Sequence, residues 1–125
     1  EIDSYLSKAN RATFVVGQIE SRALVDNIDA LVSIDGLDGV VIGPYDLSGS
    51  YDLPGEIDHP TVVEAIQLSI DKCREAGVYV GVGMGSSAAT AKRWHAAGAN
   101  WAMVGADYQY MVQFADDLYK SIRKS

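Results

Sequence analysis

Short apolar runs alternate along this chain with segments whose apolar residues recur every three or four positions. The runs occupy residues 14–19, 40–42, 78–82 and 101–104. Runs of this length that are rich in valine and isoleucine and bounded by glycine or acidic residues are typical of buried strands. The segments between them have helical periodicity, for example along the face formed by Val62, Ile66, Ile70 and Cys73. The pattern predicts four successive βα units, and therefore a parallel sheet covered by helices.

Proline, glycine and serine mark the ends of two predicted helices. Pro60 suits the first turn of a helix, because its missing N–H would have no partner there in any case, and Gly77 suits the C-cap. The next helix is predicted to start after Ser86 and Ser87, which can cap it, and to reach Ala97. These signals place a helix in each of the two middle units.

Two further helices are predicted at the ends of the chain. Residues 2–12 are expected to form a helix or turn that leads into the first strand. Asp107 is expected to cap a last helix after the fourth strand, because a carboxylate is favourable at a helix N-terminus. Its apolar face is predicted to point inward and comprises Met111, Phe114, Leu118 and Ile122.

Two architectures of the α/β class satisfy this pattern. One is an open doubly wound parallel sheet of four strands. The other is half of an eight-stranded βα barrel, a fold that usually needs about 250 residues. The chain has 125 residues, enough for one domain with a core of its own. Residues 1–125 are therefore interpreted as a single domain, and the pattern by itself leaves both architectures open.

Composition and charge narrow the class of protein. The chain carries 10 basic and 17 acidic side chains, a net charge of −7, which argues against a nucleic-acid backbone as partner. The apolar runs are too short to span a membrane, and no signal peptide is evident. A single cysteine cannot form an internal disulfide, so a cytoplasmic location is predicted. The first residue is Glu1 rather than methionine, which raises the expectation of a fragment.

Candidate chemistry lies where two neighbouring strands end. Glu20 follows the first apolar run and Asp46 follows the second. Parallel strands lie about 4.8 Å apart, so both carboxylates could reach one hard cation, as Mg²⁺ or Mn²⁺ sites in enzymes require. The alternative is that both residues only cap the helices that follow them, because acidic residues are common in first turns.

The residues around these two carboxylates resemble the HpcH/HpaI aldolase family of metal-dependent, class II 2-oxo acid aldolases, within the citrate lyase β-like superfamily. Two turns and their spacing carry most of the resemblance: Gln18 to Arg22 (Gln-Ile-Glu-Ser-Arg) and Asp38 to Ser48, with its Ile-Gly-Pro-Tyr-Asp-Leu-Ser ending. Further matches are Asp58-His59-Pro60, Ala97-Gly98-Ala99-Asn100 and Val104-Gly105-Ala106-Asp107. The resemblance extends over nearly the whole chain and covers only the C-terminal half of the family's barrel.

The resemblance implies a fold, an activity and a site. It implies strands five to eight of a (β/α)₈ barrel, and a divalent-metal-dependent carbon–carbon lyase that cleaves 4-hydroxy-2-oxo acids to pyruvate plus an aldehyde. Glu20 and Asp46 match the family's metal ligands, with Mg²⁺ or Mn²⁺ as the expected cofactor. The residues expected to hold the pyruvate-like part of the substrate are Gln18, Gly43, Pro44 and Tyr45.

The resemblance also implies what this chain lacks. The family's histidine base and its carboxylate-binding arginine belong to the other half of the barrel, so no catalytic acid–base residue is assigned here. His59 and His95 are expected to have structural or solvent-facing roles, and Arg22 a place on a helix surface. The isolated chain is therefore expected to be an incomplete enzyme.

Two other interpretations remain. Gly83, Gly85 and Ala88 fit the G-x-G-x-x-A form of a dinucleotide-binding fingerprint, with Asp107 as a candidate ribose-binding acid. A half barrel would also leave two edge strands, 14–19 and 101–104, and exposed apolar side chains. That predicts a homo-oligomer, and in its extreme form a non-catalytic, self-associating domain.

Overall fold

The computed structural model describes residues 2–85 and 87–123. Its strands, β1 to β4, are Val16–Ile19, Gly39–Ile42, Tyr79–Met84 and Trp101–Val104. Its helices, α1 to α7, are Ile2–Ala12, Arg22–Asp26, Ile28–Val32, Pro44–Ser50, Pro60–Ala76, Ala88–Ala96 and Asp107–Arg123. The four predicted βα units are therefore all present.

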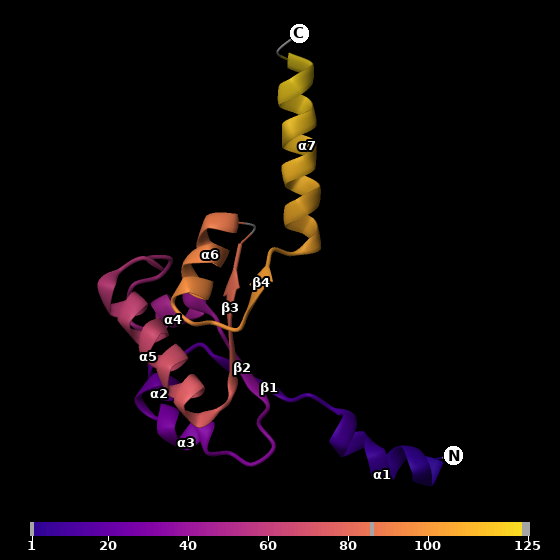
Figure 1. Cartoon of the computed structure of the whole chain (residues 1–125). Helices are drawn as coiled ribbons and strands as arrows, with labels where there is room; N and C mark the ends of the chain where they lie inside the picture. The colour runs from indigo at the N-terminus through magenta and orange to yellow at the C-terminus, as the bar shows by residue number, and fades with distance from the viewer. Residues whose placement is uncertain (1, 86, 124–125) are drawn as a thin grey trace.

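The strands form one sheet in the order β1-β2-β3-β4, and every neighbouring pair is parallel. A doubly wound sheet reverses its strand order at a switch point and carries helices on both faces. Here the order follows the chain without a reversal, and Figure 1 shows α2 to α6 gathered on one side of the sheet. This is the arrangement of consecutive units of a (β/α)₈ barrel, and the open doubly wound alternative is wrong.

The core lies between the sheet and α5. Side chains of the three strands β1, β2 and β3 that point toward the helices are fully buried: Ile19, Val40, Ile42, Val80 and Val82. The opposing face of α5 is the one that helical periodicity predicts, and its fully buried members are Val62, Ile66, Ile70 and Cys73. Burial of the Cys73 thiol raises its pKa from 9.0 to about 11, which keeps it protonated and unreactive, as expected of a core cysteine.

The predicted ends of α5 are confirmed. Pro60 is in the first turn of the helix, and Gly77 is its C-cap in the left-handed region, with φ of 75°. The segment after β1 differs from the single helical pattern of the sequence, because it forms two short helices that are separated at Asn27. The Asn27 side-chain amide donates to the Ala23 carbonyl, which satisfies the end of α2 and lets the chain turn there.

The last helix departs from its prediction. Helix α7 forms at the expected residues, but it extends away from the sheet, as Figure 1 shows, and none of its residues is buried. The side chains predicted to face inward are exposed, and Phe114 has 72% of its surface accessible. The prediction of a buried face is wrong, because periodicity reports that a helix is amphipathic and not where its partner surface is. The exposed members of that face are Met111, Phe114, Leu118 and Ile122.

The sheet face opposite the helices is open. Val16, Tyr79 and Met103 point to this side and are exposed. The Phe14 and Tyr79 rings lie 6.0 Å apart, close to the residues where β1 and β3 begin. Strands β1 and β4 are the two edges of the sheet, as the sequence predicts. Among the described residues, none of the helices has both the length and the apolar character needed to cross a bilayer.

Candidate active site

The two predicted metal ligands lie at the carboxyl ends of neighbouring strands. Glu20 directly follows β1, and Asp46 is in the first turn of α4, which begins immediately after β2. Ser21 then caps α2 by accepting a hydrogen bond from the Leu24 amide at 3.4 Å. The sharp change from strand to helix at both places leaves each carboxylate at the rim of the sheet rather than in the core.

Glycines open the space beside Glu20. Ile19, Ile42 and Val82 are register partners in β1, β2 and β3, and the residues that follow them are Glu20, Gly43 and Gly83. A Cβ atom on Gly43 would lie 3.0 Å from both Cγ and Oε1 of Glu20. A side chain at position 43 would therefore press on the Glu20 carboxylate and push it from its present position.

The six site residues predicted from the sequence line one pocket. This pocket has a volume of about 450 Å³, and Glu20, Asp46 and the four predicted substrate-binding residues are all in its wall, namely Gln18, Gly43, Pro44 and Tyr45. The sequence reasoning missed the β4 side of the pocket, which consists of Met103, Gly105, Ala106, Tyr108 and Gln109. Gln109 accepts a hydrogen bond from the Ala106 amide at 2.9 Å, the three-residue contact by which a glutamine in the first turn satisfies the N–H at a helix start.

The carboxylates at this rim influence each other. Partial burial raises the pKa of the Glu20 carboxyl above its ordinary value, and the negative charge of Asp46 and a hydrogen bond with Asp46 raise it further. The Gln18 side-chain amide donates to Oε1 of Glu20, and this hydrogen bond lowers the pKa of the Glu20 carboxyl. Two carboxylates held this close repel each other, and a cation between them would relieve the repulsion.

The α4 segment that carries Asp46 is tied down by serine hydroxyls. The buried Ser48 hydroxyl donates to the Tyr45 carbonyl at 2.6 Å and accepts from the Gly55 amide at 2.9 Å. The Ser50 hydroxyl accepts from the Arg22 amide at 2.9 Å, which links the end of α4 to the start of α2. These bonds hold the two carboxylate-bearing turns in a fixed relation.

The donor set of this pocket fits a hard divalent cation. Two carboxylates with space between them match the way Mg²⁺ and Mn²⁺ are usually held, with other positions left to water or substrate oxygens. Within residues 2–85 and 87–123, no group of three or more His, Cys, Asp or Glu side chains is placed to hold a metal. The pair therefore suits a cation that takes few protein ligands.

The histidines and Arg22 have other roles. Nδ1 of His59 accepts from the Thr61 amide at 3.3 Å at the start of α5, and Nδ1 of His95 lies 3.4 Å from the Ala99 carbonyl. The Arg22 side chain pairs with Asp26 at 3.6 Å on the surface of α2. None of these residues lines the 450 Å³ pocket, which agrees with the structural roles expected of them.

This chain is similar to known proteins in both sequence and fold. A family model described as HpcH/HpaI aldolase/citrate lyase matches residues 1–113. The chain belongs to this family. Among curated relatives, a 2-keto-3-deoxy-L-rhamnonate aldolase of Klebsiella pneumoniae subsp. pneumoniae is 38% identical over 115 residues, which are 92% of this chain and 43% of that protein. The 2-keto-3-deoxy-L-rhamnonate aldolase of Salmonella typhimurium is 35% identical over 125 residues, and the match covers 98% of this chain and 46% of the relative.

Solved structures of the HpcH/HpaI family have the same fold. A Burkholderia cenocepacia J2315 protein of the HpcH/HpaI aldolase/citrate lyase family superposes with a TM-score of 0.91 at 30% identity, over 96% of this chain and 46% of that one. An HpcH/HpaI aldolase from Desulfitobacterium hafniense DCB-2 gives a TM-score of 0.89 at 25% identity, over 100% and 48% of the two chains. The chain thus spans less than half the length of these HpcH/HpaI relatives.

The family fold leaves little support for a dinucleotide site. A dinucleotide binds at a point where the strand order reverses, and this sheet has no reversal at β3. Gly83 and Gly85 instead line the 450 Å³ pocket. Oδ1 of Asp107 accepts a hydrogen bond from the Tyr108 amide at 2.7 Å at the start of α7, a local role in the helix.

Proposed function

We propose that this chain contributes the metal- and oxo-acid-binding part of an aldolase site, in an enzyme that cleaves 4-hydroxy-2-oxo acids to pyruvate plus an aldehyde and also catalyses the reverse addition. The observation that carries the proposal is the pairing of Glu20 and Asp46 at adjacent strand ends in one pocket. Membership of an aldolase family and the names of the aldolase relatives support it.

Each residue of the pocket has a role in this proposal. Glu20 and Asp46 would hold Mg²⁺ or Mn²⁺, and Gln18 keeps the Glu20 carboxylate oriented through its hydrogen bond. The cation would supply Lewis-acid stabilisation of the negative charge that develops on the oxo-acid oxygen. Gly43, Pro44 and Tyr45 form the wall against which a small oxo acid such as pyruvate would lie.

The proton-transfer group is proposed to come from outside this chain's pocket. His59 and His95 do not line it, so a general base would belong to another part of a longer aldolase or to a second chain. We accordingly propose that residues 1–125 are one half-barrel domain of a longer enzyme that acts in the cytoplasm. The match to less than half the length of the curated relatives supports this.

A titration of the chain with Mn²⁺ tests the proposed function. We expect Mn²⁺ to bind, and to bind more tightly when oxalate, a stable two-oxygen chelator that mimics the pyruvate enolate, is present. Isothermal calorimetry or the electron paramagnetic resonance signal of free Mn²⁺ gives both affinities. An absence of Mn²⁺ binding, or binding that oxalate does not change, would contradict the proposed site.

Self-association is the second part of the proposal, because this chain exposes large apolar surfaces. Phe114 on α7 and Tyr79 on the open sheet face are more than half exposed. Surfaces of this kind mark sites of protein association. We expect a dimer or higher oligomer of the wild-type chain by light scattering at micromolar concentration, without nucleic acid or membrane as a partner.

A pair of variants on one helix tests the contribution of α7 to self-association. Phe114→Asp removes an apolar ring and adds one negative charge, and it should shift the chain toward the monomer. Ser121→Asp adds the same charge on the same exposed helix and should leave the oligomer unchanged. If the two variants have the same oligomeric state, or if the wild type is a monomer, α7 is excluded as the surface of self-association.

A further inference from the structure

A second cavity adjoins the candidate active site, and most of the residues that line it have no role in the chemistry proposed above. It has a volume of about 240 Å³ and shares Pro44, Tyr45, Gly83 and Gly85 with the 450 Å³ pocket. Pockets for drug-sized ligands usually have 300–1,000 Å³, so this one suits a fragment of a few carbon atoms. Its position makes it an extension of the site between α4 and α6.

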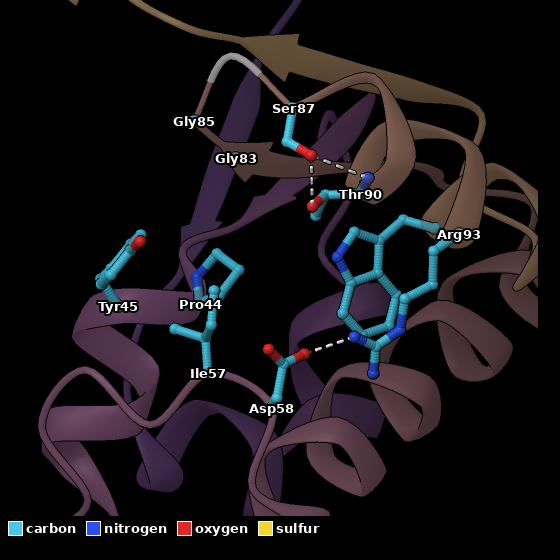
Figure 2. A pocket seen from close by; sticks show the side chains of 10 residues that line it. Pro44, Tyr45, Ile57, Asp58, Gly83, Gly85, Ser87, Thr90 and Arg93 are labelled. Atoms are coloured by element: carbon cyan, nitrogen blue, oxygen red, sulfur yellow. Dashed lines mark hydrogen bonds and ion pairs between the residues drawn. The ribbon is translucent and has the colours of Figure 1, made fainter.

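One side of this cavity is formed by an ion pair between two side chains of opposite charge. Figure 2 shows the Asp58 carboxylate facing the Arg93 guanidinium, with which it forms an ion pair. The guanidinium also lies 4.7 Å from the centre of the Trp94 ring, and Trp94 is 4% exposed. Both charged side chains keep substantial solvent exposure, so each retains sites for further hydrogen bonds. Because Asp58 offsets Arg93, this wall does not favour an anion.

The opposite side of the cavity presents hydroxyl groups. Oγ of Ser87 accepts from the Thr90 amide at 3.3 Å and from the Thr90 hydroxyl at 3.0 Å. With its oxygen accepting both bonds, the Ser87 hydroxyl hydrogen is left to donate. Pro44 and Ile57 lie between the two polar sides, as Figure 2 shows, and give the cavity an apolar floor.

We propose that this cavity binds a short, uncharged, polyhydroxylated chain, as the subsite for the aldehyde-derived end of the substrate. The assignment as a subsite rests on the proposed function. Asp58 would accept hydrogen bonds from ligand hydroxyls, and Arg93 and Ser87 would donate to them. The carbon chain would lie on Pro44 and Ile57. A carboxylate or phosphate is disfavoured, because it would face Asp58 beside an arginine that is already paired.

A nuclear magnetic resonance titration without metal tests this inference. The probe is erythritol, a neutral four-carbon polyol, and the signals followed are the Thr90 and Arg93 amides and the Trp94 indole N–H. We expect saturable shifts with erythritol. We expect affinities lower by at least about fivefold, equivalent to one hydrogen bond of ~1 kcal/mol, for 1-butanol and for the anion erythronate.

Matched variants complete the test. Ser87→Ala and Arg93→Gln should each weaken erythritol binding by a similar factor, because each removes a proposed donor to the ligand. Ser121→Ala and Arg123→Gln, which alter the same residue types on α7 away from the cavity, should not. An absence of shifts, equal binding of 1-butanol, or tighter binding of erythronate would overturn the inference. Because no metal is present, the result is independent of the Mn²⁺ titration that tests the proposed function.

Discussion

Replacement of Glu20 by alanine is expected to lower the affinity of the chain for Mn²⁺ by at least about 100-fold. Loss of a group that only hydrogen-bonds to a metal ligand already lowers metal affinity by up to about 100-fold, and Glu20 is proposed to bind the metal itself. The reason is that the pocket offers only two carboxylates, so the loss of one removes half of the charged ligands. Asp46→Ala should have an effect of the same size. Calorimetry with and without oxalate measures the change for both variants.

The control for this experiment is Glu64→Ala. Glu64 is an exposed carboxylate on α5 that does not line the pocket, and its replacement changes the net charge of the chain by the same amount. We expect Mn²⁺ affinity to be unchanged in this variant. If Glu20→Ala and Glu64→Ala bind Mn²⁺ equally well, the two strand-end carboxylates are not the ligands, and the helix-capping interpretation of these residues is favoured.

Replacement of Ile70 by alanine is expected to lower the free energy of unfolding by about 2–5 kcal/mol, the usual range for a fully buried isoleucine. Ile70 has no exposed surface and lies in the interface between α5 and the sheet. Its loss would remove buried apolar area and leave a cavity among side chains that already pack closely. Urea denaturation followed by circular dichroism at 222 nm, a wavelength that reports helix, gives the difference.

Leu68 on the same helix provides the comparison. Its side chain is 44% exposed, and we expect Leu68→Ala to change stability by less than about 1 kcal/mol. Both variants remove a branched aliphatic side chain from the interior of α5, so the difference between them isolates burial from helix propensity. Similar losses in the two variants would mean that α5 does not pack on the sheet as described.

The sequence predicted the local elements well, for identifiable reasons. Proline has a fixed φ and no N–H to donate, which suits the first turn of a helix, and glycine readily adopts the left-handed conformation of a C-cap. Pro60 and Gly77 therefore mark the ends of α5 reliably. Glu20 and Asp46 could be placed at the same rim because Glu20 directly follows β1 and Asp46 comes four residues after the end of β2, and parallel strands end on the same side. The order of residues along the chain was therefore nearly sufficient to place the two carboxylates of the candidate site at one rim of the sheet.

Features that depend on distant contacts were not predictable in this way. The amphipathic pattern of α7 was read as a buried face, yet Phe114 is exposed because no surface of this chain covers it. The cavity beside the site is closed by Asp58 and Arg93, which are 35 positions apart. Their pairing follows from how α6 packs against the sheet, and neither residue has a local signal that indicates it.

The sequence by itself determined that this protein consists of βα units with two carboxylates at adjacent strand ends, because strand and helix periodicity and turn residues are local properties of the chain. Only the tertiary structure decided between the two sheet architectures, since strand order is set by which strands form hydrogen bonds with each other. It also decided which apolar faces are covered. Burial depends on a partner surface, and a periodic pattern in one segment carries no information about that surface.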